Sequence, residues 1–310
     1  MATEGLTKTR TVARAGRPGA ATLRRMGAKR WFREIGWRHV ILLVSLLFVL
    51  FPLAWMVSAS FNAVDNLSGS TIIPAAVTLD NFTSLFGNPN VPVARWMWNS
   101  LKVALVAGAL NVFLASLAAY AFSRLRFRGR RVGLLSLLLL QVFPQFLGFI
   151  ALFLLAQQVG NVFPSFGLNT HAFLILVYMG GAIGFNAFLI KGFMDTIPVS
   201  LDESAHVDGA SPFAIFTRIV LPLSRPVLAV IFMLSFVGLY SEYILAAFLL
   251  TDTVQYTLAV GLQLFVESEY AAKWGALAAS AVIGSLPIVA VFLFAQKHII
   301  SGLTQGAVKG

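Results

Sequence analysis

The sequence contains no cysteine and few charged residues. Its 310 residues include 12 acidic and 23 basic side chains, so that only 11% of the chain is charged. A soluble protein of this length is about one quarter charged. The absence of cysteine excludes disulfides, thiolate nucleophiles and cysteine-ligated metals. Because charge is scarce and 58% of the residues are hydrophobic, the expected solvent is a lipid bilayer.

Motifs that support enzymatic chemistry are missing as well. The chain has no G-x-x-x-x-G-K-[ST] phosphate loop, and therefore no evident means of holding ATP. Its histidines lie far apart in the sequence, without metal-ligand spacing and without a Ser-His-Asp arrangement. They are His39, His171, His206 and His298. We therefore expect no catalytic residue, no metal site and no cofactor on this chain.

Long uncharged runs dominate what is present, and a membrane-spanning helix needs about 20 apolar residues. The runs lack the two-residue alternation of a barrel strand, so the predicted class is an all-α membrane protein. A turn-forming stretch at 160–171 divides the longest run into two spans. We expect a basic arm at 1–38, a membrane domain at 39–300 and a tail at 301–310. Six spans are predicted, at about 40–61, 99–123, 132–158, 171–194, 224–250 and 275–297.

Lysine and arginine are distributed unevenly between the predicted loops. If the N-terminus is inside, the inner segments hold 20 basic residues and the outer segments hold 3. This bias predicts that both termini are cytoplasmic. The net charge of +11 is then explained by basic loops and anionic lipid headgroups rather than by nucleic acid.

The stretch 23–39 is typical of a basic helix that lies on the inner membrane surface. A signal peptide is the competing interpretation of the N-terminus. The apolar run that follows is longer than the usual signal core of about 7–15 residues, which favours an uncleaved first span.

A polar segment at 200–222 separates the fourth and fifth spans. Ser200 and Glu203 have capping-box spacing, which predicts that a short helix starts there. Gly209 is placed to end that helix with a positive φ, and Ser211-Pro212 predicts the start of a second one. The segment is either an interfacial helix pair that covers the bundle or a protruding docking site that a soluble partner binds.

The stretch "ESAHVDGASPFAIFTRIVLP" (203–222) resembles the EAA signature of ABC importer permeases, with Ser204 where that family usually has alanine. In that family the segment is the coupling helix, which is held in a cleft of the ATPase subunit. The resemblance assigns this contact to Glu203, Ser204, Ala205, Asp208, Gly209, Ala210, Leu221 and Pro222.

Further stretches are similar to the maltose-type (MalG) family of these permeases. They are "WMWNSLKVA" (96–104), "AYAFSRLRFRGR" (119–130), "GLNTHAFLI" (167–175), "YTLAVG" (256–261) and "SGLTQGAVKG" (301–310). The resemblance implies a type I ABC importer permease fold in the bacterial inner membrane. It also implies import of a maltose- or maltodextrin-like sugar, although the sequence does not say which.

The resemblance also implies partner chains. These are a second, MalF-like permease, a homodimeric MalK-like ATPase that holds ATP and Mg, and an extracytoplasmic sugar-binding protein. The tail residues expected between the ATPase subunits are Gln305, Gly306, Lys309 and Gly310. By its position, the last external loop is either a solvated connector or a contact with the binding protein. The loop residues are Val266, Glu267, Ser268, Glu269, Tyr270 and Ala271.

Glu242 lies inside the predicted fifth span, where a carboxylate is expensive unless it faces water or a polar partner. It lines the translocation path, together with Tyr240 and Tyr243, or it is a protonated or helix-paired residue that aids packing. A self-sufficient secondary transporter remains an alternative function. That class needs intramembrane ionisable groups for a coupling ion, and one glutamate gives it thin support. A structural scaffold would leave the polar segment at 200–222 unexplained.

Overall fold

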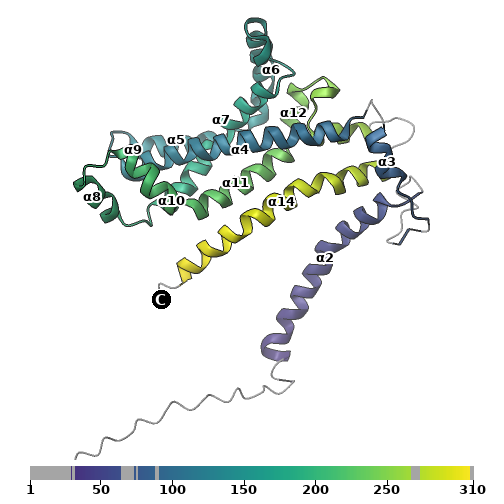
Figure 1. The fold of residues 1–310 in the computed structure, drawn as a ribbon, viewed down its shortest axis with the longest axis horizontal. Coiled ribbons are helices and arrows are strands. Elements are labelled where there is room, and N and C mark those ends of the chain that lie inside the picture. Colours follow the sequence, from purple (N-terminus) through teal and green to yellow (C-terminus); the bar gives the residue numbers. More distant parts are fainter. Residues whose placement is uncertain are drawn as a thin grey trace, which may run out of the picture. The chain divides into compact units, whose positions relative to one another are not determined.

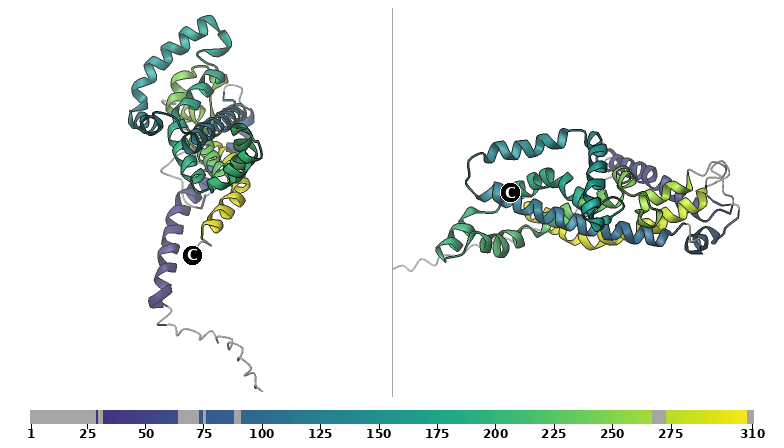
Figure 2. Two further views of the ribbon diagram at one scale, coloured as in Figure 1. Left: turned by 90° about the vertical axis from the view of Figure 1, so that its left-hand side faces the viewer. Right: turned by 90° about the horizontal axis from the view of Figure 1, so that it is seen from above.

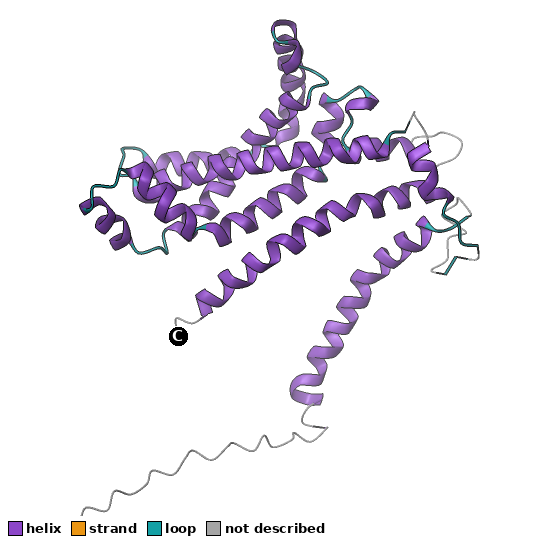
Figure 3. Ribbon diagram, viewed as in Figure 1, coloured by secondary structure: helices purple, strands orange, loops and turns teal. Residues whose placement is uncertain are grey.

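A computed structural model describes residues 29, 32–63, 73–74, 76–87, 91–266 and 273–307, without the side chains of 182 and 297–307. Throughout these ranges the chain consists of helices and turns, with one isolated β-bridge between Asn62 and Val77 (Figure 3). The prediction of an all-α protein is confirmed. The chain divides into two compact units, 1–52 and 53–310.

The described helices range in length from 3 to 34 residues, and short helices connect the long ones (Figure 1). Their bounds are η1 Phe32–Gly36, α2 Trp37–Ser60, α3 Asp80–Gly87, α4 Val93–Arg124, α5 Arg130–Val142, η2 Gln145–Gly148, α6 Phe149–Val162, η3 Pro164–Phe166, α7 His171–Met194, α8 Val199–Val207, α9 Pro212–Ile215, η4 Phe216–Val220, α10 Leu221–Leu223, α11 Arg225–Tyr240, α12 Ile244–Leu249, η5 Thr253–Gln255, α13 Leu258–Leu262, η6 Gln263–Phe265 and α14 Trp274–Ala307.

Four of the described helices are long and apolar enough to cross a bilayer. They are Phe32–Ser60, Val93–Arg124, Gln145–Val162 and Trp274–Gln296. Two further spans are formed if each bent helix pair crosses the bilayer as one unit. The pairs are Pro164–Gly181 with Ile183–Met194, and Pro212–Leu223 with Arg225–Tyr240. Counted in this way, by length and composition alone, the described residues provide up to six spans, and the bounds of the individual spans stay a prediction.

Helix α4 packs against α7 and α11 in the second unit (Figures 1 and 2). The small residues that α4 buries recur at helical spacing, as Ala104, Ala107, Ala115 and Ala119. Small side chains let helix backbones approach closely, which is how helices associate where lipid gives no hydrophobic drive. This packing places the two ends of α4 beside the segments that carry the sequence motifs.

Two helices end earlier than the sequence predicts. The third predicted span, 132–158, is interrupted because Pro144 disfavours a helical conformation at Phe143, whose ψ is 129°. Helix α6 then runs in a different direction from α5 (Figure 1). The fifth predicted span, 224–250, is also interrupted, since α11 ends at Tyr240 and α12 begins at Ile244.

Candidate functional site

The polar segment begins with α8, which starts directly after Pro198. Ser200 therefore lies inside the helix, and its carbonyl accepts a hydrogen bond of 2.8 Å from the Ser204 hydroxyl. The predicted capping box at Ser200 and Glu203 is wrong. Pro198 occupies the N-cap position with φ −57° and ψ 127°, and its geometry leads the chain straight into the first turn.

Gly209 ends α8, as predicted, with a φ of +81°. Its N–H donates to His206 O at 3.0 Å, and the Ala210 N–H donates to Ala205 O at 2.9 Å. These two bonds form a Schellman motif, in which a left-handed residue satisfies the last free carbonyls of a helix. The glycine in the signature is therefore explained by backbone geometry.

The Schellman motif turns one face of the segment inward. Ala205 and Ala210 are half-buried and pack against the core cluster that contains Ile190, Met194 and Phe216. The outward face consists of residues that the core does not use. It contains Glu203, Ser204, His206, Val207 and Asp208, all of them exposed, with Val207 at 87%.

The second helix of the segment begins at Pro212, where the Ser211 hydroxyl accepts a hydrogen bond of 3.2 Å from the Ala214 N–H. The predicted N-cap is confirmed. Phe216 and Val220 are buried, whereas Phe213 is 68% exposed. Because α9, η4 and α10 follow one another directly, the Leu-Pro end of the signature leads into α11. Leu221 and Pro222 are half-buried there, and Leu221 packs on the same core.

The C-terminal end of α4 holds the polar segment in place. Arg124 Nε lies 2.6 Å from Asp202 Oδ2, and both side chains are nearly buried. The contact is electrostatic, because the Nε–H is not aligned for a hydrogen bond. Arg124 also donates to Ile197 O at 2.8 Å, and the Tyr120 hydroxyl donates to Pro212 O at 3.0 Å. Sequence reasoning missed Tyr120, Arg124 and Asp202 as site residues, although the first two lie in "AYAFSRLRFRGR".

Asp195 forms a second link at this end of the bundle. Its carboxylate pairs with Lys191 at 2.5 Å and accepts a hydrogen bond of 2.6 Å from Ser123. Partial burial opposes ionisation, but the bonds from Lys191 and Ser123 outweigh it and hold the pKa of Asp195 below its usual value. Its contribution to stability is therefore complete above the unfolded pKa and is lost as the pH falls through the folded one.

At the N-terminal end of α4, two further motif stretches, 96–104 and 256–261, contact each other. Trp96 Nε1 donates to Thr253 O at 2.7 Å, and Asn99 Nδ2 donates to Tyr256 O at 2.9 Å. The Leu258 N–H donates to the Ser100 hydroxyl at 2.7 Å. The stretches 96–104 and 256–261 therefore hold each other through side chains that cap loop backbone groups.

The stretch 167–175 joins the same loop from α7. Asn169 Oδ1 accepts from the N–H groups of Thr251 and Asp252. His171 Nε2 lies 2.8 Å from Gln255 O, and its Nδ1 lies 2.9 Å from Lys102 Nζ. Because an ammonium group can only donate, Nδ1 accepts and Nε2 carries the proton. The loop 251–258 is therefore fixed from α4 and α7 together.

The predicted binding-protein contact and the predicted tail contact fall mostly outside the described side chains. Val266 is 40% exposed at the end of η6, and Glu267 to Ala271 lie outside the described residues. Helix α14 continues through Gln305 and Gly306 to Ala307, and Lys309 and Gly310 lie outside the described residues.

Glu242 lies in the break between α11 and α12 and lines a cavity of about 710 Å³. Its carboxylate accepts the N–H groups of Leu245 at 2.8 Å and Ala246 at 3.0 Å, and also the hydroxyl of Tyr178. Glu242 therefore caps the first turn of α12, as side-chain acceptors do at helix N-termini. Gln141 lines the same cavity and donates to Gly181 O at 2.7 Å.

The three residues predicted for the translocation path do not share this cavity. Tyr240 is 4% exposed and packs on Phe236, with ring centroids 5.6 Å apart. Tyr243 is 38% exposed but does not line the cavity. Of the three, only Glu242 reaches it. Within the described ranges, no group of three histidine or carboxylate side chains is placed to hold a metal ion.

A family model described as "Binding-protein-dependent transport system inner membrane component" matches residues 111–305. The chain belongs to this family, the membrane-embedded permeases of ABC importers, as its signature and its helical fold indicate. Its relatives include the galactooligosaccharides transport system permease protein GanQ of Bacillus subtilis (strain 168). That protein is 41% identical over 286 residues, which are 92% of this chain and 99% of GanQ.

Maltose/maltodextrin transport system permease proteins MalG are similarly related. The protein of Vibrio vulnificus (strain YJ016) is 42% identical and that of Escherichia coli (strain K12) is 40% identical, each over 88% of this chain and 95% of the relative. Among solved structures, a chain of a bacterial ABC transporter involved in the import of the polysaccharide alginate superposes with a TM-score of 0.69. It is 23% identical and covers 86% of this chain and 97% of its own. The predicted fold and the resemblance to MalG are confirmed.

Proposed function

We propose that this permease subunit imports maltose- or maltodextrin-like oligosaccharides across the bacterial inner membrane. The proposal rests on relatives that are named as permeases for maltodextrins and galactooligosaccharides and that align over nearly their whole length. The chain pairs with a second permease and receives the sugar from an extracytoplasmic binding protein. Both termini lie in the cytoplasm, in agreement with the bias of basic residues.

The observation that supports this proposal most directly is the exposed face of the polar segment, from α8 to α10. Its alanines face the core, while Glu203, Ser204 and Asp208 face outward beside the apolar side chain of Val207. An exposed face with both polar and apolar groups on two short helices suits a groove on a soluble partner. We infer that this partner is an ATPase subunit, which holds ATP and Mg, so that this chain performs no catalysis itself.

The contacts of Tyr120 and Arg124 with the polar segment, here called the clamp, give such a partner a mechanical connection to the membrane helices. A displacement of α8 acts on α4 through Asp202 and Arg124, and a displacement of α9 acts on it through Pro212 and Tyr120. Because the segment continues directly into α11, the same motion reaches a helix that packs along α4. Rigid-body movement of these helices can switch the side from which the pathway is open. ATP can drive that switch only if the ATPase binds the two access states differently.

The alternative function is a secondary transporter driven by a coupling ion, and the hydrogen bonds of Glu242 give it little support. All three bonds to its carboxylate come from groups of this chain, which makes Glu242 a helix cap that borders the cavity. We propose that Glu242 shapes the translocation path at this cavity and does not carry protons through it.

The function is tested by reconstituting the chain with the companion permease, the ATPase and the binding protein in proteoliposomes. Uptake of labelled maltodextrin and of galactooligosaccharide is measured with ATP, without ATP, and with a proton gradient alone. We expect uptake only with ATP and the binding protein. Uptake by the chain alone under a proton gradient contradicts the proposal, and ATP-driven uptake of neither sugar contradicts the proposed substrate class.

A further inference from the structure

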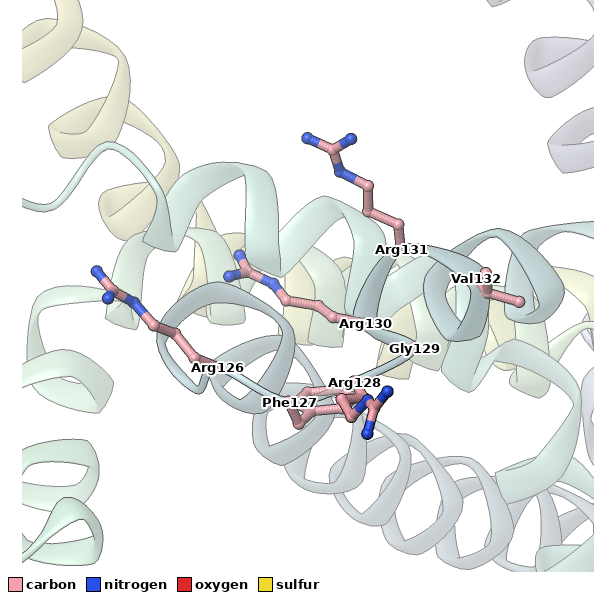
Figure 4. A pocket seen from close by; sticks show the side chains of 7 residues that line it. All are labelled: Arg126, Phe127, Arg128, Gly129, Arg130, Arg131 and Val132. Carbon is pink, nitrogen blue, oxygen red and sulfur yellow. The ribbon is translucent and has the colours of Figure 1, made fainter.

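The turn between α4 and α5 concentrates positive charge. Arg126, Arg128, Arg130 and Arg131 follow one another within six residues, and residues 126–132 line an open surface depression of about 580 Å³ (Figure 4). The turn is shaped by Gly129, whose φ is +85°. Figure 4 shows the guanidinium groups of Arg126 and Arg130 extending in the same direction, with Arg128 on the opposite side.

Most of this charge is not neutralised within the chain. Arg130 donates to Ser123 O at 3.2 Å, at the C-terminal end of α4. The neighbouring carboxylates are already paired, Asp202 with Arg124 and Asp195 with Lys191. Arg126, Arg128 and Arg131 are exposed, and no described carboxylate pairs with them. The turn is therefore equipped to bind an anion that comes from elsewhere.

The helix that follows the turn identifies where that anion comes from. None of the residues in α5 is buried, and its exposed side chains include Val132 at 68%, Leu135 at 58% and Leu139 at 69%. From Arg131 to Val142 the helix rises about 16 Å, roughly half the thickness of a hydrocarbon core. Leu125 and Phe127 add exposed apolar surface between the arginines. This order, with cationic groups at the turn and apolar side chains along α5, matches the headgroup layer and the acyl-chain layer of one membrane leaflet.

We propose that the turn 126–131 is a binding site for an anionic phospholipid, with the headgroup phosphate at the arginines and the acyl chains along α5. Guanidinium groups suit phosphate because they offer several donors in a fixed plane. The inner leaflet supplies such lipids, so the proposal rests on the orientation in the proposed function. An acidic surface of the ATPase is the competing partner for the arginines, but it leaves the apolar face of α5 without an explanation.

The test uses the full chain, assembled with its partner subunits and purified in mild detergent from membranes that contain phosphatidylglycerol. Native mass spectrometry counts the phosphatidylglycerol that stays bound to the complex. The test variant combines Arg126→Gln, Arg128→Gln and Arg131→Gln. A matched variant with lysine at the same three positions keeps the charge, and Arg95→Gln removes an exposed arginine at the opposite end of α4.

We expect the glutamine variant to bind phosphatidylglycerol more weakly by at least about fivefold, the factor expected for one basic residue near an anionic surface. The lysine variant should retain most of the lipid, and Arg95→Gln all of it. Soluble glycerol phosphate should not displace the lipid, because it lacks the acyl chains that lie on α5. Displacement by glycerol phosphate overturns the lipid assignment in favour of a simple phosphate site.

Undiminished phosphatidylglycerol in the glutamine variant overturns the proposal. If that variant keeps its lipid but loses the ATPase during purification, the arginines bind the ATPase instead. These outcomes are independent of the cargo, because lipid retention is measured without sugar. A failure of the proposed sugar import therefore leaves this result unaffected.

Discussion

At the scale of single residues, the backbone of Gly209 decides whether the segment between α7 and α11 can form. Its φ of +81° closes the Schellman motif that points Ala205 and Ala210 inward. A residue with a Cβ pays about 1–2 kcal/mol in this conformation, and a β-branched one fits it least well. No atom beyond the adjacent residues lies within 4 Å of the position where a Cβ would stand, so the backbone conformation, and not a lack of space, favours glycine here.

We predict that Gly209→Val distorts α8 and α9 without affecting insertion of the spans. The ATPase should no longer co-purify, and ATP-driven uptake should fall at least tenfold, while the amount of the chain in membranes stays normal. Gly209→Asn is the matched control, because asparagine tolerates the left-handed conformation and should keep most of the activity. If the valine variant transports at the full rate, Gly209 and the segment it shapes are not the coupling element.

Ser200 illustrates the limit of prediction at this scale. Its spacing to Glu203 fits a capping box, yet Pro198 two residues earlier is the N-cap. Both residues can start a helix, and the choice depends on how the chain leaves α7 at Ile197. The carbonyl of Ile197 accepts a hydrogen bond from Arg124, which lies 73 residues earlier in the chain. No local sequence pattern reveals this contact.

At the scale of elements, the ion pair of Arg124 and Asp202 connects α4 to α8. Their side chains are 7% and 13% exposed. Removing one partner from a nearly buried pair leaves a charge without its counter-charge, which costs about 3 kcal/mol or more in buried sites. The pair therefore stabilises the attachment of the polar segment to the bundle.

We predict that Arg124→Leu lowers the thermal unfolding midpoint of the purified complex and weakens the coupling of ATP hydrolysis to uptake. The double variant Arg124→Leu/Asp202→Leu should regain part of the stability, because no uncompensated charge remains. Arg95→Gln serves as the control, since Arg95 is exposed at the N-terminal end of α4, away from the polar segment. Asp202→Leu alone completes the comparison: if its effect and that of Arg124→Leu simply add in the double variant, Arg124 and Asp202 do not interact, and the clamp is not the mechanical link.

Broken helices are the elements that the sequence predicts least well. Pro144 is visible in the sequence, but only the fold decides that it separates α5 from α6 rather than kinking one helix. The break at Ser241–Tyr243 has no proline or glycine to mark it. It is stabilised by Tyr178 of α7, which donates to Glu242, so that a contact between helices stabilises a local interruption.

At the scale of the whole molecule, α14 is longer than a single membrane span requires. Its 34 residues span about 51 Å, and a hydrocarbon core is only about 30 Å thick. The helix therefore projects well beyond the bilayer at one end or at both. Ala295 is buried in the bundle, and the helix continues for about three further turns to Ala307.

We predict that deletion of Gln305 to Gly310 lowers sugar-stimulated ATP turnover of the assembled complex severalfold without unfolding the chain. Turnover is measured on purified complex, and folding is followed by its elution volume and thermal midpoint. A deletion of equal length in the N-terminal arm, residues 2–7, is the control and should leave turnover unchanged. Equal turnover after the C-terminal deletion would remove the tail from the mechanism.

The sequence by itself determined the class of this protein. Apolar run length, the bias of basic residues and the spacing of Glu203, Asp208-Gly209 and Leu221-Pro222 are local properties, and each has a local physical cause. The tertiary structure alone decided which distant residues meet. The motifs at 96–104, 167–175 and 256–261 are separate in the chain, and they converge on one loop only after α4 packs against α7. Side-chain hydrogen bonds and ion pairs across many residues depend on packing geometry, which no pattern of a few positions contains.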